Sequence, residues 1–267
     1  MLAATPPVAA QLVRADAAFR AAVAHWDDAT ALPQAAIAAV AREQQIELRL
    51  AGDERLYRVT IAQLPARLRR DVVDDVQAHR ELTGIAPKQA GPPIRLGPAL
   101  PLARLRALYA EGRRRSGVAW QLLAAINYVE TDFGRLREPS ASGALGPMQF
   151  MPATWRAYGR GNVRDPRDAI LAAARYLRAA GAPADVPGAL HHYNPSAAYV
   201  NAVLRFASRI RRDRFGLAAL YARRLIVRTA HGYRRLNAAA PAGQAAAAGV
   251  VPSSPGTSSA GTGRPSR

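Results

Sequence analysis

The sequence contains no cysteine, so it has neither a disulfide framework nor a thiolate site. It also lacks an uninterrupted apolar run of about 18 residues, the length that a membrane-spanning helix needs. We therefore expect no transmembrane segment. The first ten residues are apolar, but they lack a basic region and contain Pro6 and Pro7, which makes them a poor secretory signal.

Acidic residues are scarce beside basic ones, with 19 Asp and Glu against 37 Lys and Arg, and the formal net charge is +18. Such a charge favours an anionic partner, for which nucleic acid and the anionic polymers of a cell wall are both candidates. The short arginine clusters have no aromatic residues between them, which favours a solvated basic face and argues against a nucleic-acid partner. These clusters are Arg113–Arg115, Arg211–Arg212 and Arg223–Arg224.

Helical periodicity dominates the chain, and we predict an all-α fold. An N-terminal helical arm covers residues 1–84 and a Pro/Gly-rich linker covers 85–101. The main helical domain covers 102–210, a basic helical extension 211–237, and a disordered tail of Ala, Pro, Gly, Ser and Thr 238–267. The arm and the main domain are predicted to be separate units that can pack together. Asp74 and Asp75 in the arm are interpreted as part of a solvated helix face rather than as catalytic carboxylates.

A helix is predicted between Val118 and Glu130, because its apolar residues recur at helical spacing. Glu130 stands at the inner end of this apolar helix, near the C-terminus, where the helix dipole disfavours negative charge. Both effects favour the protonated carboxyl group, which is the state that a general acid needs near neutral pH. The alternative is a solvated residue at a helix end.

A glycine-punctuated segment follows at residues 142–155. Gly143 and Gly146 allow sharp turns or a close approach of the backbone to a ligand. Gln149 offers both a donor and an acceptor within an apolar Met-Gln-Phe-Met run, which suits the recognition of an amide or a sugar hydroxyl. Pro152 is predicted to be the first residue of the next helix. The alternatives are that the glycines belong to an ordinary loop and that the Met and Phe side chains simply pack in the core.

Two later segments carry local signals. Asp165 and Pro166 are predicted to begin a scaffold helix as its N-cap and first residue. His191 and His192 are adjacent and therefore point in different directions, and no carboxylate ligand stands nearby, so we expect no metal site. No cofactor is expected either.

The order Glu-Thr-Asp-Phe-Gly at 130–134, followed by Ser-Gly-Ala-Leu-Gly-Pro-Met-Gln-Phe-Met-Pro at 142–152, is more specific than its parts. It resembles the soluble-lytic-transglycosylase (SLT) type catalytic domain, which is related in fold to goose-type lysozyme, and the resemblance covers about residues 102–210. It implies a lysozyme-like helical domain that cleaves peptidoglycan glycan strands between N-acetylmuramic acid and N-acetylglucosamine. A location in the cell envelope, outside the cytoplasm, is then expected, with peptidoglycan and possible further envelope proteins as partners.

The resemblance also implies residue roles. Glu130 would protonate the leaving oxygen and then activate the 6-hydroxyl of the muramic acid, which gives a 1,6-anhydromuramyl end. The substrate-binding residues implied are Ser142, Gly143, Met148, Gln149, Phe150, Tyr193, Asn194 and Tyr199. The chain departs from the usual pattern at Thr131, where Ser is common, and at His192, where a small residue is usual.

No second catalytic carboxylate is evident, since Asp132 points about 200° away from Glu130 around the helix. Two other functions remain open. One is a muramidase that uses the same Glu130 but hydrolyses with water. The other is a non-catalytic wall-binding or assembly protein that acts through its basic surface.

Overall fold

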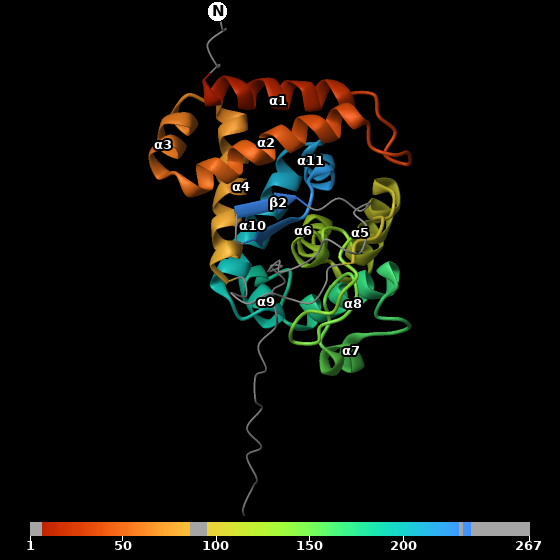
Figure 1. Ribbon diagram of the computed structural model, residues 1–267. Coiled ribbons are helices and arrows are strands. Elements are labelled where there is room, and N and C mark those ends of the chain that lie inside the picture. Colours follow the sequence, from red (N-terminus) through yellow and green to blue (C-terminus); the bar gives the residue numbers. More distant parts are fainter. Residues whose placement is uncertain (1–6, 86–94, 230–231, 236–267) are drawn as a thin grey trace, which may run out of the picture.

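The computed structural model describes residues 7–85, 95–229 and 232–235. Within these ranges the fold is helical, as predicted, with one short antiparallel hairpin (Figure 1). The elements are α1 (Val8–Val23), α2 (Gln34–Gly52), α3 (Glu54–Ala62), α4 (Ala66–Ile85), α5 (Leu102–Ser116), α6 (Trp120–Thr131), α7 (Pro152–Tyr158), α8 (Pro166–Ala179), α9 (Val186–Tyr193), α10 (Ala197–Arg212), α11 (Gly216–Ala222), β1 (Ile226–Thr229) and β2 (Gly232–Arg235). No helix in the described part of the chain is long and apolar enough to cross a membrane.

Short polar side chains begin several of these helices. The carboxylate of Asp165 accepts the backbone N–H of Asp168 at 2.9 Å, and Pro166 is the first residue of α8. Pro152 is likewise the first residue of its helix, α7, which has no side-chain cap. Both predicted helix starts are confirmed, because proline has the φ angle of a first helical residue and has no N–H to leave unpaired.

The N-terminal arm packs directly on the main domain. Side chains of α1, α2 and α4 lie in the same hydrophobic core as those of α5, α6 and α10, for example Phe19, Val40 and Ala78 with Leu108 and Phe206. A second, smaller core lies within the arm itself. Figure 1 shows α4 running beside α10, with α1 and α2 at one end of the molecule. The arm and the main domain therefore share one core.

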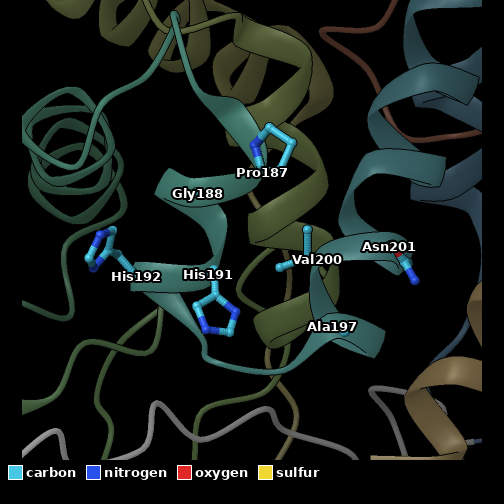
Figure 2. A pocket seen from close by; sticks show the side chains of 7 residues that line it. All are labelled: Pro187, Gly188, His191, His192, Ala197, Val200 and Asn201. Atoms are coloured by element: carbon cyan, nitrogen blue, oxygen red, sulfur yellow. The ribbon is translucent and has the colours of Figure 1, made fainter.

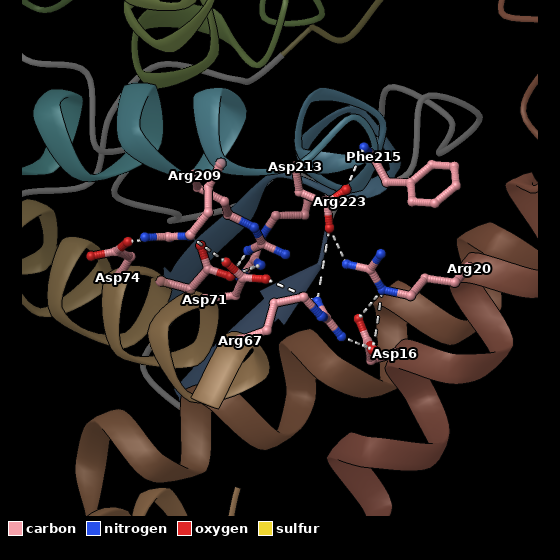
Figure 3. Close-up of polar contacts among 11 residues, drawn as sticks. Asp16, Arg20, Arg67, Asp71, Asp74, Arg209, Asp213, Phe215 and Arg223 are labelled. Carbon is pink, nitrogen blue, oxygen red and sulfur yellow. Dashed lines mark hydrogen bonds and ion pairs between the residues drawn. The ribbon is translucent and has the colours of Figure 1, made fainter. Parts of the chain in front are cut away.

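The contact between arm and main domain includes buried charges (Figure 3). Asp75 on α4 is 1% exposed and is ion-paired with Arg209 of α10 and with Arg223, which follows α11. Arg223 also pairs with Glu47 of α2. The prediction of a solvated face at Asp75, and of a solvated basic face at Arg223, is wrong, because α4 turns this face toward α10 instead of toward water.

The basic extension is not one helix. Helix α10 ends at Arg212, because Asp213 has extended backbone (φ −142°) and its side chain accepts the N–H of Phe215 at 2.9 Å. After the short α11, the β-branched residues Ile226, Val227 and Thr229 belong to β1, which pairs antiparallel with β2. The prediction of a helical extension over 211–237 is therefore wrong for these residues, since β-branched side chains favour strands. The predicted tail, 238–267, and residues 86–94 of the linker lie outside the described residues.

Candidate active site

Helix α6 carries Glu130 into the interior. The helix buries its apolar residues in the main core, among them Leu123 and Ile126, which are fully buried. Glu130 lies one residue before the end of the helix and is itself 3% exposed. The hydroxyl of Tyr199, on α10, donates a hydrogen bond of 2.7 Å to Oε1 of Glu130. The predicted location at the inner end of an apolar helix is confirmed.

A second tyrosine lies beside this pair. The rings of Tyr193 and Tyr199 are parallel, with 6.5 Å between their centroids. Burial, and then the nearby charge of Glu130, raise the pKa of both phenols well above the ordinary value of 10. Each phenol therefore keeps its proton and serves as a hydrogen-bond donor, Tyr199 to Glu130 and Tyr193 to the carbonyl oxygen of Met148 at 2.6 Å.

The glycine-punctuated segment forms a tight loop next to α6. Leu145 and Phe150 exchange two backbone hydrogen bonds, of 2.8 and 2.9 Å, which close the four residues between them. Gly146 has a left-handed φ of 75°, and a Cβ there would lie 1.9 Å from the carbonyl oxygen of Val163. Only glycine fits this position without displacing the backbone.

Gln149 is held inside this loop. It is 2% exposed and has a left-handed φ of 48°, which is uncommon for a residue with a side chain. Its Nε2 donates to the carbonyl of Gly146 at 3.0 Å, whereas its Oε1 is buried and has no partner among the described residues. An unpaired buried acceptor costs about 1–3 kcal/mol, which makes this oxygen a candidate acceptor for a donor from a ligand.

The other predicted binding residues fall into two groups. Phe150 packs against Tyr193, with 6.0 Å between ring centroids, and so belongs to the cluster around Glu130. Ser142 and Gly143 lie exposed on a separate turn, in which Gly143 donates to the carbonyl of Ser140. Asn194 is buried, and its backbone closes α9 by donating to the carbonyl of Leu190 at 2.8 Å. The backbone hydrogen bonds of Gly143 and Asn194 run within their own segments.

The two carboxylates that follow Glu130 in the sequence have other partners. Asp132 ends α6 in a left-handed conformation and binds Nη1 of Arg135 at 2.8 Å. Burial raises the pKa of Asp132, while the charge of Arg135 opposes that rise. Glu138 is paired with Arg95. Both carboxylates have structural partners, so the site is built around one carboxylate.

A buried polar network that the sequence analysis missed supports the loop. The hydroxyl of Tyr109, on α5, donates to Oδ1 of Asn127 at 2.7 Å, and Nδ2 of Asn127 donates to the carbonyl of Pro147 at 2.8 Å. Thr131 donates to the same carbonyl at 2.7 Å. A signal was present in the sequence, since Asn127 is a polar residue within an apolar helix, one turn before Glu130.

A pocket of about 400 Å³ lies between α9 and the start of α10 (Figure 2). Its lining is mostly apolar, and the two histidine rings point in different directions. The lining residues are Pro187, Gly188, His191, His192, Ala197, Val200 and Asn201. In the described part of the chain no three His, Cys, Asp or Glu residues come together as a group that could hold a metal ion.

The site thus combines a buried carboxylate at the end of an apolar helix with a tight, glycine-containing loop, and the sequence comparisons assign this part of the chain to the lytic transglycosylase class. Residues 108–215 match the family described as "Transglycosylase SLT domain", so the chain carries an SLT-type lytic transglycosylase domain. A stretch of 76 residues is 38% identical to the "Membrane-bound lytic murein transglycosylase F" of Thiobacillus denitrificans (strain ATCC 25259 / T1). That stretch is 28% of this chain and 16% of the relative. No solved structure matches the chain.

Proposed function

We propose that the protein is a peptidoglycan lytic transglycosylase in which Glu130 is both the general acid and the general base. The observation that carries the proposal is the buried Glu130 carboxylate, which accepts the hydroxyl of Tyr199 at 2.7 Å beside a loop with an unpaired acceptor at Gln149. The SLT domain match and the lytic murein transglycosylase relative support the reaction class.

The reaction would proceed in two steps at one carboxyl group. Glu130 first donates its proton to the glycosidic oxygen between N-acetylmuramic acid and N-acetylglucosamine, and the bond from C1 to that oxygen breaks. The resulting carboxylate then accepts the proton of the muramic acid 6-hydroxyl while that oxygen bonds to C1. Glu130 ends protonated, as it began, and no water is consumed.

A single carboxylate suits this chemistry. Glycosidases that hydrolyse generally need two carboxylates on either side of the bond, one as acid and one as nucleophile or base. Here Asp132 and Glu138 are each paired with an arginine. The substrate's own N-acetyl and 6-hydroxyl groups would take over the work of the missing second carboxylate.

The proposed binding roles are based on the geometry of the cluster. The Oε1 of Gln149 would accept a hydrogen bond from an acetamido N–H or a hydroxyl of the sugar, and Met148, Phe150, Tyr193 and Tyr199 would form the wall around the reacting ring. Ser142, Gly143 and Asn194 are proposed as more distant binding positions. With peptidoglycan as its substrate, the protein would act in the cell envelope, and other envelope proteins are proposed as partners.

The proposal is tested by mass spectrometry of the products released from purified peptidoglycan. Products lighter than hydrolysed muropeptides by one water, released by the wild type and not by Glu130→Gln, are expected. Glutamine keeps the shape of the side chain and an oxygen that can accept from Tyr199, so the variant should melt like the wild type. General acid-base catalysis is worth roughly 10²- to 10⁴-fold, so the rate should fall by at least that much.

Glu138→Gln is the matched control, because it neutralises a nearby carboxylate that is paired with Arg95. It should keep wild-type activity. Hydrated products from the wild type would instead assign a muramidase. Binding to the wall without release of soluble products, unchanged in Glu130→Gln, would assign a non-catalytic binding protein.

A further inference from the structure

Three buried groups from three segments form a continuous hydrogen-bonded chain beside Glu130. Tyr109 on α5 is fully buried, and Asn127 on α6 is 1% exposed. The hydroxyl of Tyr109 donates to Oδ1 of Asn127 at 2.7 Å, and Nδ2 of Asn127 donates to the carbonyl oxygen of Pro147 at 2.8 Å. The chain thus joins α5, the catalytic helix and the glycine loop.

The chemistry of its two ends sets the direction of this chain. A carbonyl oxygen only accepts, so the group of Asn127 that faces Pro147 must be its Nδ2. Oδ1 of Asn127 then faces Tyr109 and needs a donor, which the phenol provides. Burial raises the pKa of Tyr109 well above its ordinary value, so its proton is retained. The phenol proton therefore gives Oδ1 of Asn127 its donor in the same amide orientation that directs Nδ2 toward Pro147, where Nδ2 also lies 3.5 Å from Oγ1 of Thr131.

The loop is held at Pro147, where this series of hydrogen bonds ends. The carbonyl of Pro147 also accepts from Oγ1 of Thr131 at 2.7 Å, so donors on both sides of Glu130 in the sequence bind the same oxygen. The next residue, Met148, has its own carbonyl bound by Tyr193. Gln149, with its unpaired acceptor, follows Met148 directly and is two residues from the carbonyl that these donors hold.

We propose that Tyr109 is a positioning residue for the reaction: through Asn127 and the Pro147 carbonyl, its hydroxyl fixes the Met148–Gln149 segment relative to Glu130. The inference rests on the proposed function for its catalytic consequence. Its structural consequence, the placement of the loop, is independent of that function. A misplacement of about 1 Å at a catalytic site can cost about 100-fold in rate.

The first test compares Tyr109→Phe with Tyr57→Phe. Each variant deletes one buried phenol hydroxyl, but Tyr57 lies in the N-terminal arm, where its hydroxyl accepts from Gln77 at 3.3 Å. Tyr109→Phe should lower kcat on purified peptidoglycan by about 10-fold or more, with a smaller change in KM, while Tyr57→Phe leaves both unchanged. Equal effects of the two substitutions would overturn the proposal.

The second test uses the pH profile of Asn127→Asp. An ionised aspartate accepts from Tyr109 but has no proton for the carbonyl of Pro147, whereas a protonated one restores the donor. The ratio of kcat for this variant to that for the wild type should therefore rise as the pH falls. A ratio that is constant with pH would show that the bond to Pro147 does not set the rate.

The third test does not depend on activity. Backbone amide signals of Met148, Gln149 and Phe150 in ¹⁵N NMR spectra should shift in Tyr109→Phe and stay in place in Tyr57→Phe. Unshifted signals would overturn the proposal, and so would shifted signals with an unchanged kcat. If the wild type released no muropeptides at all, the proposed function would fail, while the NMR comparison would still decide whether Tyr109 positions the loop.

Discussion

The hydroxyl of Tyr199 donates to Oε1 of Glu130 across 2.7 Å, although the two residues are 69 positions apart in the chain. The bond links α10 to the end of α6, and both side chains are buried. A carboxylate oxygen in a dry site gains more from a donor than it would in water, because the local dielectric constant is lower. Tyr199 is therefore placed to hold the carboxyl group of Glu130 in position.

Replacing this tyrosine tests that role. Tyr199→Phe should lower kcat by about 10- to 100-fold, since a hydrogen bond to a charged group is worth about 1.5–3 kcal/mol. Tyr221→Phe is the control, because the hydroxyl of Tyr221 donates to the carbonyl of Leu100, at 3.0 Å. An unchanged kcat in Tyr199→Phe would contradict this role.

Alanine substitutions at the two glycines of the loop region distinguish the stability cost of steric crowding from that of backbone strain. Gly146 and Gly143 both have left-handed φ angles, of 75° and 85°. A Cβ at Gly146 would meet the carbonyl of Val163 at 1.9 Å, whereas at Gly143 there is open space. Gly143→Ala should cost about 1–2 kcal/mol of stability, from backbone strain alone. Gly146→Ala should cost about 3 kcal/mol or more and abolish activity, because overpacking adds to that strain.

Chemical denaturation of both variants measures this difference, together with assays of peptidoglycan cleavage. Similar losses of stability in the two variants would mean that the loop can move away from Val163 at little cost.

Much of the site could be predicted because its signals are local in the sequence. The helix that ends at Glu130, the tight loop around Gly146 and the helix start at Pro152 each follow from neighbouring residues. The Tyr109–Asn127 pair could not be predicted, since it depends on how α5 lies against α6. The exposed positions of Ser142 and Gly143 likewise depend on a fold of the turn that the motif alone does not specify.

The arm was harder to predict, because an amphipathic helix does not reveal what covers its polar face. Leu68, Val72 and Val76 recur at helical spacing and are buried on α4, yet Asp75 beside them faces Arg209 instead of solvent. A buried carboxylate and a solvated one look identical in a sequence. The pairing partner lies 134 positions away, on a helix that the periodicity placed in another unit.

This buried pairing predicts a large effect of Asp75→Ala. Removing the carboxylate leaves Arg209 and Arg223 without this partner in the protein interior, and breaking a buried pair costs about 3–5 kcal/mol. The melting temperature should fall by about 10 °C, given about 2–4 °C per kcal/mol for chains of this size class. Glu54→Ala removes an exposed carboxylate that pairs with Arg58 and Arg80, and it should change the melting temperature far less. Equal shifts in the two variants would show that the buried ion pairs of Asp75 stabilise the fold no more than the exposed pairs of Glu54 do.

Ionisation of Glu43 destabilises the folded protein as the pH rises, whereas a carboxylate in an ordinary ion pair becomes stabilising as it ionises. It is 3% exposed on α2, and burial, with the charge of Glu47 as the next cause, raises its pKa from 4.5 to about 7. Between these two values the folded state binds more protons than the unfolded state. Stability therefore falls as the pH rises from about 4.5 to about 7, by an amount on the order of 3 kcal/mol.

Glu43→Gln should remove this penalty, because glutamine stays neutral at every pH. Urea denaturation should show little change at pH 5 and a gain on the order of 2–3 kcal/mol at pH 8. Glu54→Gln is the control, since pairing with Arg58 lowers the pKa of this exposed carboxylate, and the variant should show no gain at pH 8. A gain for Glu43→Gln of the same size at both pH values would mean that packing, and not ionisation, limits the stability of α2.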